Sequence, residues 1–160
     1  MIYIFPFDIL IFLTTAVACT ELAEAVKKIC QASVANRKEN DTEVNRKTSW
    51  ACFDLGQLYE MGVGTEQNWA KAVESYEIPC ADGHWRACDR LAMIISRGVE
   101  GVPANPKRAL DLFEKGCAGG HGKSCVHAGA AYQNARQPRE AFRCVLSMLL
   151  GTVLGNWLSC

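Results

Sequence analysis

The sequence predicts an all-α protein built from stacked helical hairpins, and three observations support this fold class. First, one short phrase occurs twice, as Cys80-Ala-Asp-Gly-His-Trp-Arg-Ala-Cys88 and as Cys117-Ala-Gly-Gly-His-Gly-Lys-Ser-Cys125. Second, the same register extends upstream, because Ala51-Cys52 stands where Ala87-Cys88 stands one unit later. Third, apolar residues recur at helical spacing between turns that contain glycine and proline. A hairpin unit of about 36 residues cannot bury its apolar face alone, so the units are expected to stack.

Each central unit is predicted to contain two helices separated by a turn. We expect helices over residues 50–61 and 69–78 in one unit, and over 86–97 and 107–115 in the next. Asn68 and Asn105 are placed to cap the second helix of each unit, and Pro79 is expected to follow the last turn of its helix. The apolar face of the first helices consists of Leu55, Leu58, Tyr59, Leu91, Ile94 and Ile95, with Gly56, Ala92 and Gly129 as small residues where helices cross closely.

The chain divides into four segments. Residues 1–18 are an apolar run ending in an Ala-x-Ala site, which predicts a secretory signal cleaved after Ala18 or, if uncleaved, an N-terminal membrane anchor. Residues 19–49 are expected to form a helix over 21–33 followed by a polar insertion. Residues 50–143 hold the repeats, and the last repeat has lost its turn glycines, as a terminal unit would. Residues 144–160 carry no charge and form either a capping helix or sequence outside the repeat fold.

The composition limits the function classes. Lys and Arg number 17 and Asp and Glu also 17, so the chain offers no electrostatic argument for nucleic-acid binding. Cysteine is abundant, with 9 residues, and none of them forms a Cys-x-x-Cys motif. This usage favours a disulfide framework, and therefore an oxidising compartment, over a redox motif.

Two stretches resemble a known family. Their residues read Ala51-x3-Leu55-Gly56-x2-Tyr59-x2-Gly62-x-Gly64 and Lys71-Ala72-x3-Tyr76-x3-Cys80-x2-Gly83-x3-Ala87-Cys88. This pattern resembles a Sel1-like repeat. A Cys-x7-Cys pair in the repeat is similar to the Helicobacter cysteine-rich proteins and to a eukaryotic relative, a cytochrome c oxidase assembly factor of the mitochondrial intermembrane space.

The resemblance implies a fold, an activity and a compartment. The fold would be a right-handed, TPR-like superhelix of disulfide-stapled hairpins that binds a polypeptide partner. The bacterial group also implies a weak beta-lactamase or penicillin-binding activity, and the eukaryotic relative implies assembly of a respiratory complex. The expected compartment is secreted or periplasmic, with the intermembrane space as the alternative.

Three disulfides are expected from this alignment. Cys80 pairs with Cys88 and Cys117 with Cys125 across the turn that joins consecutive helices, while Cys30 aligns as the partner of Cys52. Reduced thiols packed as small core residues are one alternative. Zinc is another, because His84 and His121 each lie between two cysteines and His127 adds a further ligand to the second set.

No residue is assigned to catalysis, to a metal or to a cofactor. A serine acylation mechanism of the beta-lactamase type needs Ser-x-x-Lys, and no serine here has a lysine three residues on. Binding is instead expected on the concave side of the first helices, where an ordinary solvated surface is the alternative. The positions expected there are Asp54, Gln57, Met61, Arg90, Met93, Arg97, His127, Ala130 and Asn134.

Overall fold

The computed structural model describes residues 6–35 and 49–154, with side chains for 17–35 and 49–146. This part of the chain forms seven α-helices and, apart from an isolated bridge between Val99 and Val102, no β-structure. The helices are α1 (Pro6–Ala35), α3 (Trp50–Met61), α4 (Trp69–Ala81), α5 (Trp85–Arg97), α6 (Pro106–Ala118), α7 (Gly122–Asn134) and α8 (Pro138–Leu154). The prediction of an all-α fold is therefore confirmed.

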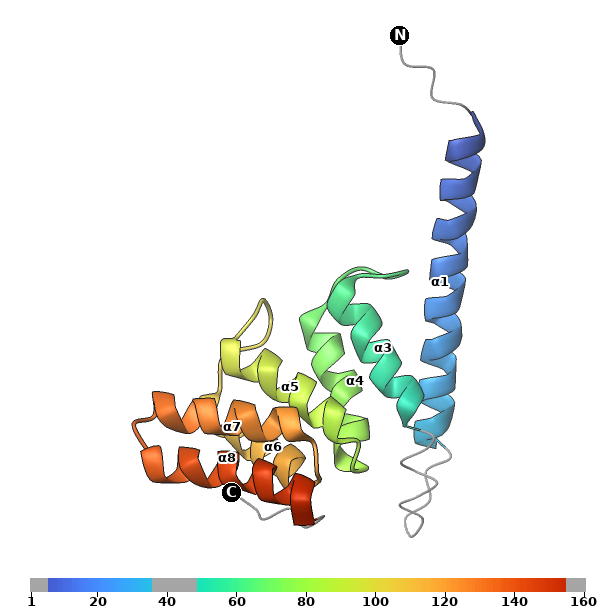
Figure 1. Cartoon of the computed structure of the whole chain (residues 1–160). Coiled ribbons are helices and arrows are strands. Elements are labelled where there is room, and N and C mark those ends of the chain that lie inside the picture. Colours follow the sequence, from blue (N-terminus) through green and yellow to red (C-terminus); the bar gives the residue numbers. More distant parts are fainter. Residues whose placement is uncertain (1–5, 36–48, 155–160) are drawn as a thin grey trace.

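The helices stack in the order of the chain. The main contacts among the described helices are those of α1 with α3, α3 with α4, α4 with α5, α5 with α6, α6 with α7 and α7 with α8. Figure 1 shows this succession of antiparallel hairpins, with the N-terminal part of α1 extending far beyond the others. Contacts restricted to neighbouring units are typical of a solenoid.

Several helix boundaries are set by capping residues that can be recognised in the sequence. Asn68 accepts a hydrogen bond from the Lys71 amide (2.9 Å), and Asn105 accepts one from the Arg108 amide (3.0 Å). These contacts satisfy amides that the first turns of α4 and α6 would otherwise leave unpaired. At the other end, Gly62 adopts a left-handed φ of 69° and its amide donates to the Leu58 carbonyl, which ends α3.

Two expected boundaries are wrong. The first helix is not confined to residues 21–33, because α1 runs without a break from Pro6 to Ala35. Pro79 does not follow α4 but lies inside it. An interior proline removes its own amide donor and crowds the carbonyl four residues earlier, yet the helix resumes its bonding beyond it, with the Asp82 amide donating to the Ile78 carbonyl (3.2 Å).

The core lies between the hairpins and uses the expected apolar face. Leu55, Leu91, Ile94 and Ile95 are buried, whereas Leu58 is only partly buried. Gly56 is needed where α3 crosses α4, since a Cβ atom there would lie 2.5 Å from the Tyr76 ring. None of the helices in the described residues combines the length and the apolarity that a membrane span needs.

Candidate functional site

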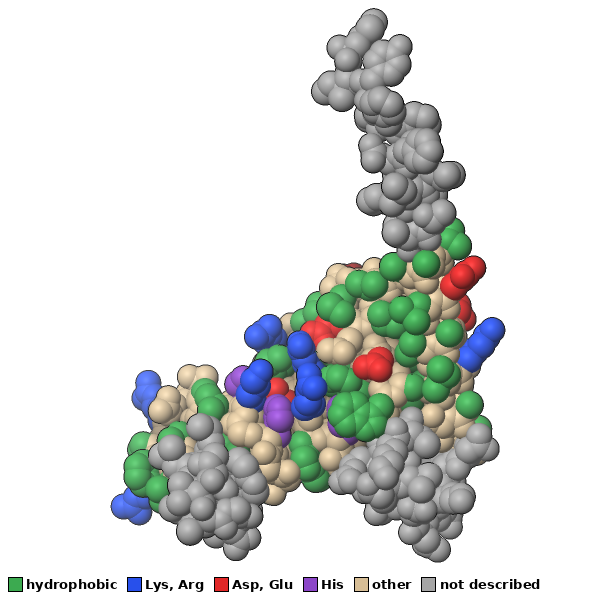
Figure 2. Space-filling model, turned by 45° about the vertical axis from the view of Figure 1, so that its right-hand side comes forward, with side chains coloured by type: hydrophobic (Ala, Val, Ile, Leu, Met, Phe, Trp, Pro, Cys, Tyr) green, Lys and Arg blue, Asp and Glu red, His purple; other side chains and the backbone are tan. Residues whose placement is uncertain are grey.

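A hollow of about 410 Å³ opens where the first helices of successive units meet. Its walls come from α3, α5 and α7, with one residue from the turn before α7. Figure 2 shows Lys, Arg and His side chains gathered on one face of the body, with acidic side chains among them. The lining residues are Phe53, Arg86, Asp89, Arg90, Met93, His121, Lys123 and His127.

Disulfides fix the turns beside this hollow. Cys80–Cys88 joins the end of α4 to the start of α5, and Cys117–Cys125 joins α6 to α7 in the same way. Cys30–Cys52 ties α1 to α3. The three pairs are those expected from the sequence, and Cys144, which the sequence left unpaired, is disulfide-bonded as well. Because these sulfur atoms are oxidised, the cysteines flanking His84 and His121 cannot supply the thiolates that a zinc site would use.

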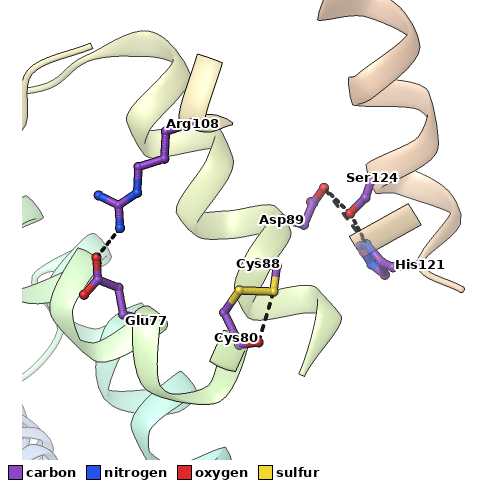
Figure 3. Close-up of a disulfide and its surroundings, with 7 residues drawn as sticks. All are labelled: Glu77, Cys80, Cys88, Asp89, Arg108, His121 and Ser124. Carbon is purple, nitrogen blue, oxygen red and sulfur yellow. Dashed lines mark hydrogen bonds and ion pairs between the residues drawn. A yellow bond between two sulfur atoms is a disulfide. The ribbon is translucent and has the colours of Figure 1, made fainter. Parts of the chain in front are cut away.

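An ion pair links α4 to α6 near the Cys80–Cys88 disulfide (Figure 3). Arg108 on α6 donates to Glu77 on α4 (2.5 Å), so the second helices of two units are linked directly. Figure 3 shows this pair on one side of the Cys80–Cys88 bridge and Asp89 on the other. The disulfide therefore fixes the start of α5 at a point that lies between the Arg108–Glu77 ion pair and Asp89 (Figure 3).

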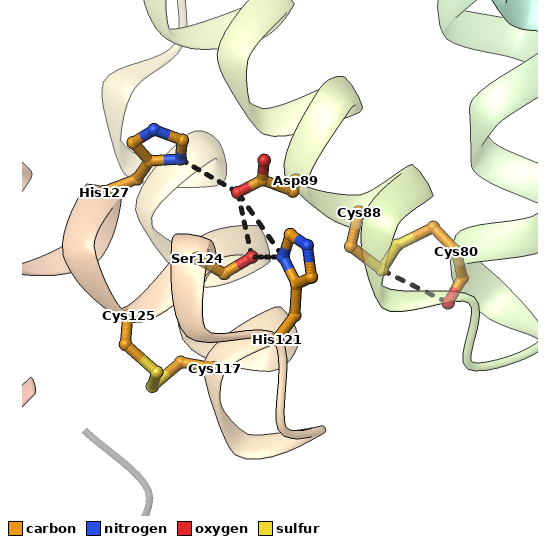
Figure 4. A network of polar contacts seen from close by, with 8 residues as sticks. All are labelled: Cys80, Cys88, Asp89, Cys117, His121, Ser124, Cys125 and His127. Atoms are coloured by element: carbon orange, nitrogen blue, oxygen red, sulfur yellow. Dashed lines mark hydrogen bonds and ion pairs between the residues drawn. A yellow bond between two sulfur atoms is a disulfide. The ribbon is translucent and has the colours of Figure 1, made fainter. Parts of the chain in front are cut away.

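Asp89 is the centre of a polar network that connects α5 to α7. Its Oδ1 atom accepts a hydrogen bond from the Ser124 hydroxyl (2.9 Å) and another from Nδ1 of His127 (2.9 Å). Nδ1 of His121 lies 3.0 Å from the Ser124 oxygen (Figure 4). Because the Ser124 proton is directed at Asp89, His121 is the donor in that contact. Burial lowers the pKa of His121, which favours its neutral form.

Aspartate, histidine and serine are also the residue types of a hydrolase triad, but their arrangement here is different. In a triad the histidine accepts the serine proton and the serine oxygen faces the substrate. Here Ser124 donates to Asp89 instead, and its side chain is fully buried, at 0% exposure. The geometry therefore favours a structural link between two units over a nucleophile.

A second carboxylate, Glu60, lies outside the lining and contacts the lining residue Arg90. Glu60 on α3 accepts a hydrogen bond from the Tyr76 hydroxyl on α4 (2.6 Å) and one from Nη1 of Arg90 on α5 (3.1 Å). Burial and the Glu60 contact both raise the pKa of Tyr76, so its hydroxyl stays protonated and remains a donor. Arg90 on α5 is thus positioned by Glu60 on α3, which is itself held by Tyr76 on α4.

Only part of the predicted binding surface lies in the hollow. Arg90, Met93 and His127 line it as residues of successive first helices. The other predicted positions lie outside its lining, and most of them are exposed: Asp54, Gln57, Met61, Arg97, Ala130 and Asn134. Asp54 is nevertheless close enough to Arg86 for the arginine charge to oppose the rise in the Asp54 pKa that burial causes.

Five residues that line the hollow were not predicted for the binding surface, and for two of them the repeat pattern could have indicated the position. Arg86 and Lys123 occupy the same position of the duplicated phrase, two residues after its histidine. Arg90 and His127 are likewise equivalent positions of successive units. A column of basic residues on consecutive repeats was therefore visible in the alignment. Phe53 and Asp89 had no such signal, and His121, the histidine of the second phrase, was considered only as a zinc ligand.

His84 does not line the hollow but lies behind it in the core. Its ring lies 4.1 Å from the Trp50 ring and 4.6 Å from the Phe53 ring, measured between centroids. Within the described residues, neither ring nitrogen has a hydrogen-bond partner. The backbone of His84 belongs to the turn that precedes α5, but its side chain is a buried core group.

Comparison with known proteins agrees with this architecture. Residues 51–77 and 85–121 match the model of the Sel1 repeat. The crystal structure of a Sel1 repeat protein from Oxalobacter formigenes superposes with a TM-score of 0.59 at 20% identity, over 83% of this chain and 57% of that one. A search among curated proteins finds no match.

A second solved structure is that of c5321, a protective antigen of uropathogenic Escherichia coli that displays an SLR fold. It gives a TM-score of 0.43 at 14% identity, over 90% of this chain and 42% of that one. This chain thus spans 57% of the length of the first neighbour and 42% of the length of the second. Residues 51–77 and 85–121 are therefore similar to Sel1 repeats, and the all-helical fold of the described residues agrees with this likeness.

Proposed function

We propose that this chain is a protein-interaction module that binds a polypeptide segment on the face formed by α3, α5 and α7. The observation that carries the proposal is the hollow between these three helices, where charged and polar side chains of successive units converge. Sel1 repeats generally mediate protein–protein interaction. A groove lined by equivalent positions of a repeat suits an extended chain, because both have a regular spacing along one direction.

The proposed surface extends beyond the hollow along the first helices. Asp54 and Met61 on α3 and Asn134 on α7 are exposed, as is Arg97 at the end of α5. Gln57 is half-buried on the same helix as Asp54. These positions would contact a bound segment on either side of the hollow.

Binding is favoured over hydrolysis by the state of the one serine in the polar network. Ser124 is inaccessible and donates its proton to a carboxylate, so the lactam-hydrolysing activity implied by the bacterial resemblance has no support from this site. We therefore propose no reaction for the chain.

The disulfides indicate an oxidising compartment. We propose that the chain works outside the reducing cytosol, as a secreted or periplasmic protein, with the mitochondrial intermembrane space as the alternative. The disulfides between consecutive units, Cys80–Cys88 and Cys117–Cys125, also support placing the chain with the cysteine-rich branch of the Sel1 repeat proteins.

Site-specific photocrosslinking tests the proposed face. A photoreactive amino acid at Met93, in the hollow, is expected to give protease-sensitive adducts with a polypeptide in extracts of the native compartment. The matched control is the same amino acid at Asp111, which is exposed on α6. Adducts formed equally at both positions would contradict the assignment. Turnover of a chromogenic lactam by the purified protein, abolished by Ser124→Ala without unfolding, would favour an enzyme instead.

A further inference from the structure

The charge of the hollow differs from that of the chain as a whole. The complete sequence has equal numbers of basic and acidic residues, 17 of each. The hollow, by contrast, is lined by Arg86, Arg90 and Lys123 and by a single carboxylate, Asp89. Two histidines, His121 and His127, complete the polar lining, so positive charge is concentrated at this one place.

Carboxylates offset part of this charge, because Asp89 lies in the lining and Glu60, outside the lining, pairs with Arg90. The side chain of Asp89 is only 8% exposed, and its Oδ1 atom already accepts hydrogen bonds from Ser124 and His127. These two hydrogen bonds keep the Oδ1 atom of Asp89 engaged with side chains of the protein itself. Arg86 and Lys123 form no ion pair within the described residues, so their charges remain available to a ligand.

Two of the three basic groups are held in place, and all three remain accessible. Arg86 is exposed, and its guanidinium carbon lies 5.5 Å from the Phe53 ring centroid, within the range of a cation–π contact. Arg90 gives one donor to Glu60, yet its side chain is 40% exposed, which leaves other guanidinium donors available to a ligand. Lys123 is exposed in the first turn of α7. Preorganised cations of this kind lose less conformational entropy when they bind an anion.

Chemical complementarity identifies the class of ligand. Guanidinium groups bind carboxylates through paired N–H···O bonds, and the nearby Met93 offers an apolar contact for a neighbouring side chain. The volume of about 410 Å³ admits a few side chains and not the face of a whole helix. We propose that the hollow binds an acidic stretch of an extended polypeptide, with its carboxylates held by Arg86, Arg90 and Lys123. This inference rests on the proposed function and specifies the partner.

Peptide display against the full 160-residue chain, with its disulfides intact, tests the inference. The expected outcome is enrichment of sequences rich in Asp and Glu. In fluorescence polarisation, replacing the acidic residues of a selected peptide by Asn and Gln should weaken binding at least tenfold. Raising the salt concentration should weaken it as well, because the contacts are partly exposed ion pairs.

Charge reversal on the protein locates the site. Arg86→Glu combined with Lys123→Glu should reduce the affinity at least tenfold. The matched control, Lys107→Glu with Arg139→Glu, reverses two exposed cations outside the hollow and should change it less than twofold. Circular dichroism must show equal helicity in both double variants; Lys123→Gln replaces the test variant if it does not.

The other outcomes separate this inference from the proposed function. Enrichment of neutral or basic sequences that compete for the same face would overturn the acidic partner and leave the interaction module standing. Failure to enrich any sequence counts against both. Equal affinity for a single-stranded oligonucleotide of the same charge would overturn the inference too, because it would assign the cluster to polyanions in general.

Discussion

The Ser124 hydroxyl on α7 donates a hydrogen bond of 2.9 Å to the Asp89 carboxylate on α5. Both side chains are buried, and they belong to the first helices of successive repeats. In a solenoid each unit contacts only its neighbours, so a buried polar link of this kind contributes directly to the interface between units. The same carboxylate also forms one wall of the hollow. Stability and binding are therefore connected at Asp89.

Removing the Ser124 hydroxyl should destabilise the protein. We expect Ser124→Ala to lower the free energy of unfolding by about 1–3 kcal/mol, because Asp89 loses a donor in a buried site. The matched control is Ser96→Ala, since the Ser96 hydroxyl donates to the Met93 carbonyl of its own helix. Chemical denaturation of the oxidised proteins measures both changes. Equal midpoints for the two variants would show that the link between the repeats is unimportant.

The disulfides should resist alkylation in the denatured, unreduced protein. Peptide mapping is expected to recover the links 30–52, 80–88 and 117–125, whereas the exposed thiol of Cys19 is labelled. By loop entropy each short bridge stabilises the fold by about 2.5 kcal/mol and the longer one by about 3.4 kcal/mol. Labelling of Cys80 and Cys88 in natively purified protein would contradict this pairing.

The repeat made much of the fold predictable. A duplicated phrase sets the unit length, and the unit length sets which cysteines face each other, so the helix order and the three disulfides could be foreseen. The caps at Asn68 and Asn105 could be foreseen as well, because an asparagine at the start of a helix has a specific local partner. Pro79 shows the limit of local rules. Its helix continues because later amides and tertiary packing outweigh one missing donor.

The site was less predictable than the fold for a physical reason. The sequence places Arg90, Met93 and His127 on one face by periodicity, which needs only a helix register. The Asp89–Ser124 contact depends on how closely two helices from different units approach each other. The periodicity of apolar residues along one helix does not predict that distance between helices. His84 was considered only as a possible zinc ligand, because its place in the core depends on packing between helices.

The register of the repeat can be tested in the core. Leu91 is 1% exposed and lies between successive hairpins. Leu91→Ala should therefore cost roughly 2–4 kcal/mol, as buried leucine truncations do. The control is Glu66→Ala, an exposed position in the turn between α3 and α4 that should change stability by less than about 0.5 kcal/mol. If both variants unfold at the same denaturant concentration, the assigned face is wrong.

The buried histidine should make the protein less stable in mild acid. Burial, reinforced by the charge of Arg86, lowers the pKa of His84 to about 4 from its ordinary value of 6.5. The unfolded chain therefore binds a proton between these two pH values while the folded chain does not. Stability that is present above pH 6.5 is lost as the pH falls toward 4, by on the order of 3 kcal/mol in total from this group.

His84→Phe isolates this effect, because phenylalanine keeps a planar ring between Trp50 and Phe53 and cannot be protonated. At neutral pH the variant should be at least as stable as the natural protein, since it removes ring nitrogens that have no partner in the described structure. Denaturation midpoints measured between pH 7 and pH 4 should fall less steeply for the variant. Carboxylates and His121 titrate in both proteins, so the difference between the two curves reports on His84 alone. Parallel curves would mean that the His84 ring gains a proton without leaving its site, and that burial does not control its charge.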